Sequence, residues 1–159
     1  MRIIRFDQPE RIVSHPPGHG VSYRGCNHEG YAGGGHDCQV GTVWTDVFGV
    51  TWRKEQAGVM GFPLNHPMSD LSAMDRYAWP DPDDARIHGW IYEKARQRPG
   101  DREHFLVGSH RETLWEKAYM LVGMERLMEA MAAEPAAAHE VFRRVMDFQM
   151  GIAKHYLAV

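Results

Sequence analysis

Between Leu114 and Met131, apolar residues recur every three or four positions, and charged residues, Lys117 among them, occupy the other side. This spacing places the apolar side chains on one face of a helix. The segment is therefore predicted to be one long amphipathic helix. Thr113 and Glu116 stand three residues apart at its start, which is the spacing of a capping box.

A short apolar run at 105–107 precedes this helix and ends at Gly108. Apolar runs bounded by glycine favour a strand buried on both faces. A strand followed by a loop and a helix is typical of α/β proteins, which place binding residues in such loops. This loop holds Ser109, which can donate a hydrogen bond, and His110, which can act as acid or base near neutral pH. We expect Gly108, Ser109 and His110 to line a substrate pocket.

The remaining pattern predicts further elements. Alternating apolar residues predict a β-hairpin with strands near 47–53 and 58–63. Ser69 or Asp70 can cap a short helix within 68–79, and the proline- and aspartate-rich segment before residue 83 favours a helix at 83–97. A last helix is predicted at 136–157, with an apolar face that we expect to need a further partner.

Most of the 16 glycines and 9 prolines lie in the first hundred residues. The sequence therefore predicts an α/β protein with a loop-rich first half and a helical second half. We divide it into a leading segment and Gly/His-rich loop (1–41), a β-hairpin (42–67), a helical segment (68–100), and a strand with two helices (101–159). All four are expected to belong to a single partial domain.

Charge and hydropathy exclude some classes of partner. The net charge is −3, whereas nucleic acid calls for a basic surface. No apolar run approaches the roughly 20 residues of a membrane span, and the first residues lack the apolar core of a signal peptide. We expect no nucleic-acid partner, no membrane contact and a cytoplasmic location.

Four residues, Cys26, His28, His36 and Cys38, have side chains of the kind that zinc prefers. Their spacing differs from the familiar zinc-finger patterns, in which at least two residues separate paired ligands. A flexible loop that merely contains these residues is the other interpretation. No metal site is assigned to them, and zinc stays an alternative.

Several stretches together resemble the uroporphyrinogen decarboxylase superfamily, and most nearly its corrinoid-linked and O-demethylating methyltransferases: FDQPERI, TDVFGVTWRKE, AWPDPDD and GSHRETLWEKAYMLVGMERLM. The resemblance implies a TIM (β/α)8 barrel. Such a barrel needs about 250 residues, so the 159 residues are expected to form its N-terminal part. The spacing from Gly108 to Tyr119 matches that of the decarboxylases, which implies a substrate-binding role for Tyr119.

The implied function is methyl transfer involving a corrinoid protein, with this chain inactive alone and binding no cofactor itself. The expected ligand is a small molecule or a tetrapyrrole or corrinoid, and catalytic residues are not assigned. One alternative is uroporphyrinogen decarboxylase, a lyase of porphyrin biosynthesis, although the arginine-rich stretch that holds its substrate carboxylates is missing. Another is a non-enzymatic half-barrel module that binds a second copy of itself or a second barrel half.

Overall fold

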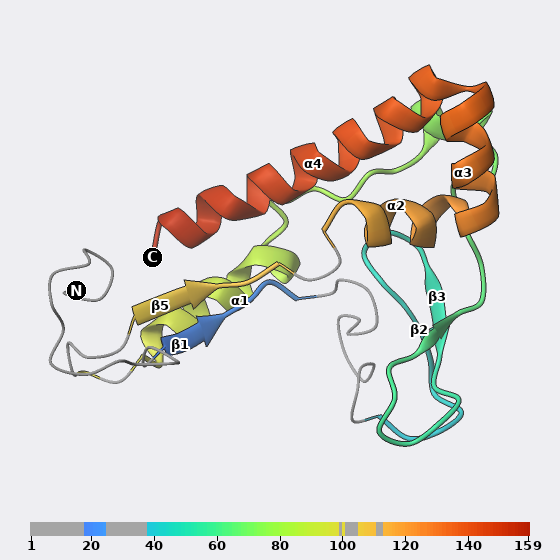
Figure 1. Cartoon of the computed structure of the whole chain (residues 1–159). Helices are drawn as coiled ribbons and strands as arrows, with labels where there is room; N and C mark the ends of the chain where they lie inside the picture. Colours follow the sequence, from blue (N-terminus) through green and yellow to red (C-terminus); the bar gives the residue numbers. More distant parts are fainter. Residues whose placement is uncertain (1–17, 25–37, 99, 101–104, 111–112) are drawn as a thin grey trace, which may run out of the picture.

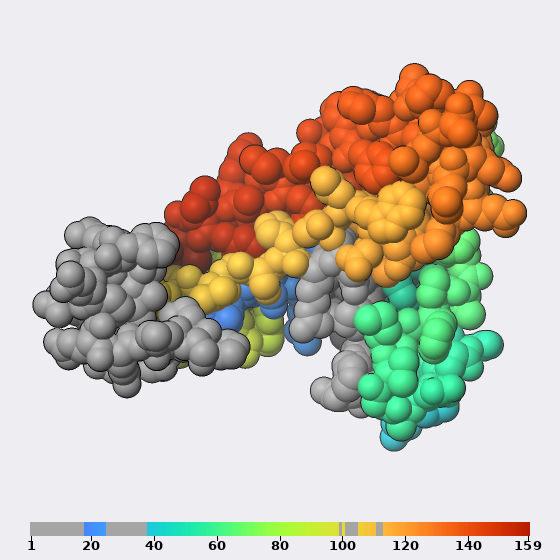
Figure 2. Space-filling view, viewed as in Figure 1, coloured from blue at the N-terminus to red at the C-terminus, as the bar shows by residue number. Residues whose placement is uncertain are grey.

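Two small sheets and a set of helices make up the part of the chain that the computed structural model describes, which is residues 18–24, 38–98, 100, 105–110 and 113–159 (Figure 1). One sheet pairs two parallel strands, and the other has three antiparallel strands. The longest helix, α4 (Pro135–Leu157), runs along one side of the molecule (Figure 2). The antiparallel sheet projects from the opposite side as a separate lobe.

The parallel sheet consists of β1 (Gly18–Val21) and β5 (Phe105–Gly108). Helix α1 (Ala85–Arg96) lies between them in the sequence and packs against β1, as a crossover between parallel strands requires. The prediction that the 105–107 strand is buried on both faces is wrong, since Val107 is 45 % exposed. Only two strands pair in the described part of this sheet, so it is too narrow to be covered on both faces.

The antiparallel sheet consists of β2 (Val43–Thr45), β3 (Thr51–Arg53) and β4 (Phe62–Pro63). The strand predicted at 47–53 is shortened to 51–53 because residues 46–50 form a turn, and the strand predicted at 58–63 is shortened to 62–63 because a second turn includes residues 57 and 58. Asp46 organises this turn: its carboxylate accepts hydrogen bonds from the backbone N–H of Phe48 (2.9 Å) and Val50 (3.0 Å) and from the indole N–H of Trp52 (3.1 Å). Gly49 adopts a φ of +73°, which favours glycine.

Aspartate caps begin the two helical segments that follow. The Asp70 side chain accepts a hydrogen bond from the Ser72 N–H (3.0 Å) at the start of the 3-10 helix η2 (Leu71–Arg76). The Asp84 side chain accepts one from the Arg86 N–H (2.8 Å) at the start of α1. Both aspartates satisfy donors that a helix start leaves free, and α1 lies within one or two residues of the predicted 83–97.

The predicted single helix between Leu114 and Met131 is wrong, because it breaks at Gly123 into α2 (Trp115–Val122) and α3 (Met124–Ala133). Gly123 has a φ of +91°. The Met120 carbonyl accepts a hydrogen bond from His66 Nδ1 (2.8 Å), and the Leu121 carbonyl accepts one from the backbone N–H of Met68. A distant segment thus takes the carbonyls that a continuing helix would use.

The predicted capping box at the start of this region is also wrong. Helix α2 begins after Leu114 rather than Thr113, and no side chain caps it. Lys117, predicted on the exposed side, is fully buried. The reason is that the antiparallel sheet with its turn at 46–50, which we call the hairpin lobe, covers this side of α2. The contact between Lys117 and the Phe48 ring shows this.

Helix α4 supplies much of the core. Its apolar face, formed by Ala138, Val141, Val145, Phe148 and Ile152, is buried. Helices α1, α2 and α3 all pack against α4. The expectation that this face needs a further partner is therefore wrong for the described residues.

Histidines join α4 to α1. The rings of His88 and His155 stack with centroids 4.1 Å apart and an interplanar angle of 7°. His155 Nε2 donates to the Asp83 carboxylate (2.8 Å), and its Nδ1 accepts from the Tyr92 hydroxyl (3.0 Å). These contacts fix the C-terminal turns of α4 over the first turns of α1.

The predicted fold class, the opening part of a TIM barrel, is wrong for the part of the chain that the structure describes. The strands form a parallel pair and an antiparallel triplet, and no barrel closes. The physical reason is that the hairpin strands pair with one another, while α2, α3 and α4 follow without an intervening strand. None of the helices in the described ranges has the length and hydropathy of a membrane span.

Candidate functional site

The carboxyl ends of β1 and β5 lie at one edge of the parallel sheet, because Val21 pairs with Gly108. The loop after each strand contributes an aromatic ring there. Tyr23 follows β1 and His110 follows β5, and their ring centroids are 6.0 Å apart. In α/β proteins ligands bind outside the carboxyl ends of parallel strands. We call the residues gathered at this edge the carboxyl-end cluster: Tyr23, Ser109, His110, Gln149 and Tyr156.

Tyr156 of α4 ties the two loops together. Its hydroxyl donates to the Ser109 carbonyl (2.7 Å) and accepts from the Tyr23 N–H (3.2 Å). Its ring lies so close to Gly108 that a Cβ at that position would be 2.8 Å from the ring. Glycine at 108 is therefore required for packing at the site, since only a residue without a Cβ lets α4 approach the strand.

His110 is half-buried and held from several sides. Its Nδ1 forms a short hydrogen bond with Oε1 of Gln149. The ring meets that of Tyr156 edge to face, with centroids 5.1 Å apart. Gln149 is only 7 % exposed, and its Nε2 is buried without a hydrogen-bond partner among the described residues. A buried amide donor without an acceptor is uncommon and needs an explanation.

Tyr119 is also expected beside these residues. It is half-buried on α2, and its ring contact among the described residues is with Trp115, at 6.1 Å. Within the described ranges, the contacts of Gly108, Ser109 and His110 include Tyr156 and Gln149, whereas the ring contact of Tyr119 is with Trp115.

Sequence reasoning missed Tyr23, Gln149 and Tyr156 as members of the cluster. Gln149 carried a usable signal, because it is a polar residue on the side of α4 that faces the core, next to Phe148. Buried amides are normally hydrogen-bonded to a specific partner. Tyr23 and Tyr156 carried no such signal, since aromatic residues are common in any core.

Two buried residues of opposite charge, Asp46 and Lys117, are linked to the cluster by a row of aromatic rings. The Lys117 ammonium is 4.6 Å from the centroid of the Phe48 ring, and its charge acts on the buried Asp46 carboxylate. Burial raises the pKa of Asp46, and Lys117 and the hydrogen bonds that Asp46 accepts oppose that rise. Phe48 packs on Phe148 (4.9 Å), and Phe148 packs on Tyr23 (5.8 Å). An aromatic row therefore connects the hairpin lobe to the cluster.

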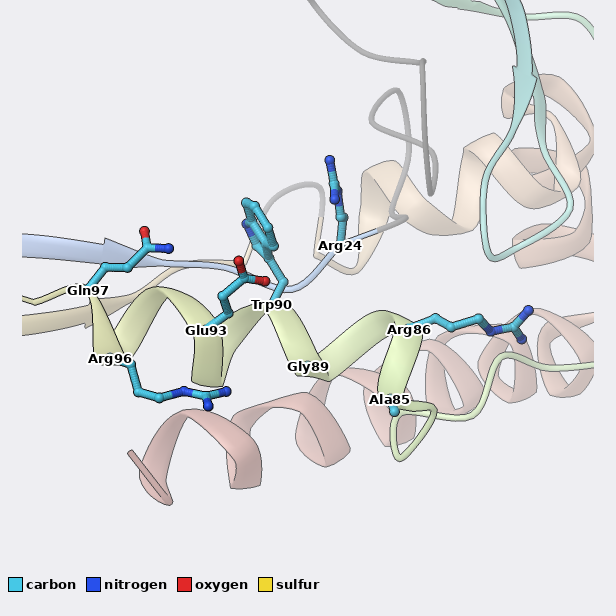
Figure 3. A pocket seen from close by; sticks show the side chains of 8 residues that line it. All are labelled: Arg24, Ala85, Arg86, Gly89, Trp90, Glu93, Arg96 and Gln97. Carbon is cyan, nitrogen blue, oxygen red and sulfur yellow. The ribbon is translucent and has the colours of Figure 1, made fainter.

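A second candidate is the open groove beside Trp90, about 610 Å³ in volume, on the outer side of α1 (Figure 3). The Arg24 guanidinium lies 4.5 Å from the centroid of the Trp90 ring, and the Lys94 ammonium lies 4.9 Å from it. Figure 3 shows Arg86 and Arg96 pointing away from Arg24 and Trp90. The arginines do not converge on one point, as recognition of an anion would require.

The structure supplies no geometry for the zinc alternative. Cys26, His28 and His36 lie outside the described residues, and Cys38 is half-buried. Within the described ranges, no group of three or more His, Cys, Asp or Glu side chains is placed to hold a metal ion.

Comparisons with known proteins add no family to this picture. No family model, no curated protein and no solved structure matches the chain. The resemblance to the uroporphyrinogen decarboxylase superfamily therefore stays a prediction from the sequence motifs.

Proposed function

We propose that the chain binds a small methyl-bearing molecule at the carboxyl-end cluster, as the substrate-binding part of a methyl transfer to a corrinoid or thiol acceptor. The observation that carries the proposal is the meeting of Tyr23 and His110 where two parallel strands end. The methyl chemistry comes from the sequence resemblance, and the site comes from the geometry.

The cluster has groups suited to such a ligand. The ring of half-buried Tyr156 offers a flat apolar surface, and half-buried His110 can give or take a proton. Tyr23 and Gln149 are buried and support these two residues from within. When a methyl–oxygen bond breaks, its electron pair stays on the oxygen, which then takes a proton. Imidazole is the side chain best suited to supply that proton near neutral pH.

Equilibrium dialysis tests the proposal with two probes, the methoxylated phenol guaiacol and methylcobalamin. We expect at least one of them to bind with a Kd of about 1 mM or tighter. The variant His110→Ala should weaken that binding at least about tenfold. The matched control His139→Ala removes an exposed histidine of α4 and should leave binding unchanged. Binding of neither probe, or equal binding by both variants, would contradict the proposal.

The alternatives drawn from the sequence stay predictions, and each has its own measurement. Decarboxylation of uroporphyrinogen by this chain would replace the proposed function with a lyase activity. Light scattering that finds a second copy of the chain, together with no binding of either probe, would favour an oligomerising module.

A further inference from the structure

We infer that Gln149 is a positioning residue, which fixes His110 so that Nε2 is the ring nitrogen that exchanges a proton with the bound molecule. This inference rests on the proposed function and specifies the atom of the same site that acts. It begins from the hydrogen bond between His110 Nδ1 and Gln149 Oε1.

The direction of this hydrogen bond follows from chemistry. The carboxamide oxygen of Gln149 can only accept, so the hydrogen must be on Nδ1 of His110. A neutral imidazole carries one hydrogen, and Nε2 is then a bare acceptor. If the ring takes up a proton, that proton goes to Nε2, because Nδ1 stays bonded to Gln149. In both protonation states Nε2 is the nitrogen that can exchange a proton.

The surroundings keep this arrangement rigid. Gln149 lies on the buried side of α4 beside Phe148, so its amide has little freedom to turn. The rings of Tyr23 (6.0 Å) and Tyr156 (5.1 Å) confine the His110 ring. Tyr156 is itself fixed by its hydrogen bond to the Ser109 carbonyl.

The second half of the Gln149 amide is left without an acceptor. Its Nε2 is buried and has no hydrogen-bond partner among the described residues, which is an unfavourable burial. The two nitrogens of an imidazole lie on different edges of the ring, so a ligand oxygen that meets His110 Nε2 lies away from this amide. The ligand class is therefore set by His110: a molecule whose oxygen exchanges a proton with Nε2, such as a methoxylated phenol.

The step balances when the methyl acceptor is included: the methyl–oxygen bond breaks, the methyl group passes to the corrinoid or thiol acceptor of the proposed function, and the electron pair stays on the oxygen. The hydrogen leaves His110 Nε2 as the oxygen of the departing group gains it, and the ring returns to the neutral form with its hydrogen on Nδ1. The protein forms no bond to carbon in this step.

Nitrogen NMR of ¹⁵N-histidine-labelled protein tests the inference without any ligand. We expect neutral His110 to carry its hydrogen on Nδ1, which is the less common form of free histidine. Gln149→Glu keeps an acceptor oxygen and should preserve that form. Gln149→Leu removes the acceptor and should return His110 to a mixture, while the exposed control Gln56→Leu changes nothing.

Binding then separates this inference from the proposed function. For guaiacol we expect Gln149→Leu to raise the Kd about tenfold, and Gln149→Glu to raise it less. If wild-type His110 carries its hydrogen on Nε2, the inference is overturned even where guaiacol binds. If the hydrogen is on Nδ1 and neither guaiacol nor methylcobalamin binds, the proposed function fails while the role of Gln149 in holding the ring stands.

Discussion

The ring of Pro82 lies directly against the backbone of Gly151, where a Cβ would be 2.4 Å from the proline Cγ. This contact sets the distance between α4 and the segment that leads into α1. Four residues further along α4, His155 stacks on His88 of α1. The absence of a side chain at position 151 is thus what lets the two helices meet.

Gly151→Ala should destabilise the protein, even though alanine favours a helix by about 1 kcal/mol over glycine. The added methyl must push Pro82 away, and overpacking of this kind costs about 1–3 kcal/mol. Urea unfolding followed by circular dichroism measures the change. Gly89→Ala is the matched control, since a Cβ at Gly89 of α1 meets nothing within 4 Å, and it should stabilise the protein slightly. An equal gain in the free energy of unfolding for both variants would show that the Pro82 ring moves aside at no energetic cost.

Gly108→Ala should disturb the carboxyl-end cluster through the ring of Tyr156. The new Cβ would lie 2.8 Å from that ring, so Tyr156 must move and lose its hydrogen bond to the Ser109 carbonyl. We expect a loss of about 1–3 kcal/mol in the free energy of unfolding. The same change in a Tyr156→Ala background should cost much less, because the clash is gone. Equal costs in the two backgrounds would mean that Tyr156 is not what confines this position.

Lys117→Met should destabilise the protein by about 3 kcal/mol, because it leaves the buried Asp46 without its nearby positive charge. Combining it with Asp46→Asn should cost less than the sum of the two single variants. The exposed Lys154→Met serves as control and should change the free energy of unfolding by less than about 0.5 kcal/mol. Strict additivity of the two buried substitutions would show that the charges act independently.

Asp46 should also leave a signature in the pH dependence of stability. Burial raises its pKa above the ordinary 3.8, so the folded state holds this proton more tightly than the unfolded state does. The stabilisation that protonated Asp46 contributes to the folded state is therefore full below the ordinary pKa, and it is lost as the pH rises through the raised pKa. Asp46→Asn removes this titration. The stability of the wild-type protein relative to Asp46→Asn should fall as the pH rises from the ordinary pKa of 3.8 through the raised pKa, and a relative stability that rises with pH there would contradict the direction of the shift.

The sequence was most informative where structure depends on near neighbours. Asp70 and Asp84 satisfy donors two residues away, and those helix starts were predicted from local sequence. Gly123 alone does not reveal the helix break, because the break depends on His66 and Met68, more than fifty residues away. Lys117 was placed on the wrong face for the same reason, since the hairpin lobe that covers it is distant in sequence. Ser109 and His110 were predicted because a loop after a strand is a local signal, whereas Gln149 and Tyr156 come from another helix.

The most direct test of the carboxyl-end cluster as a ligand site is a titration with guaiacol followed by residue-resolved NMR. We expect the largest shifts at Tyr23, His110 and the side-chain amide of Gln149, while Trp90 in the groove outside α1 and Lys94 next to its ring stay unchanged. Saturable shifts confined to Tyr23, His110 and Gln149 would support the site, whereas shifts centred on Trp90, or none at His110 and Gln149, would contradict it.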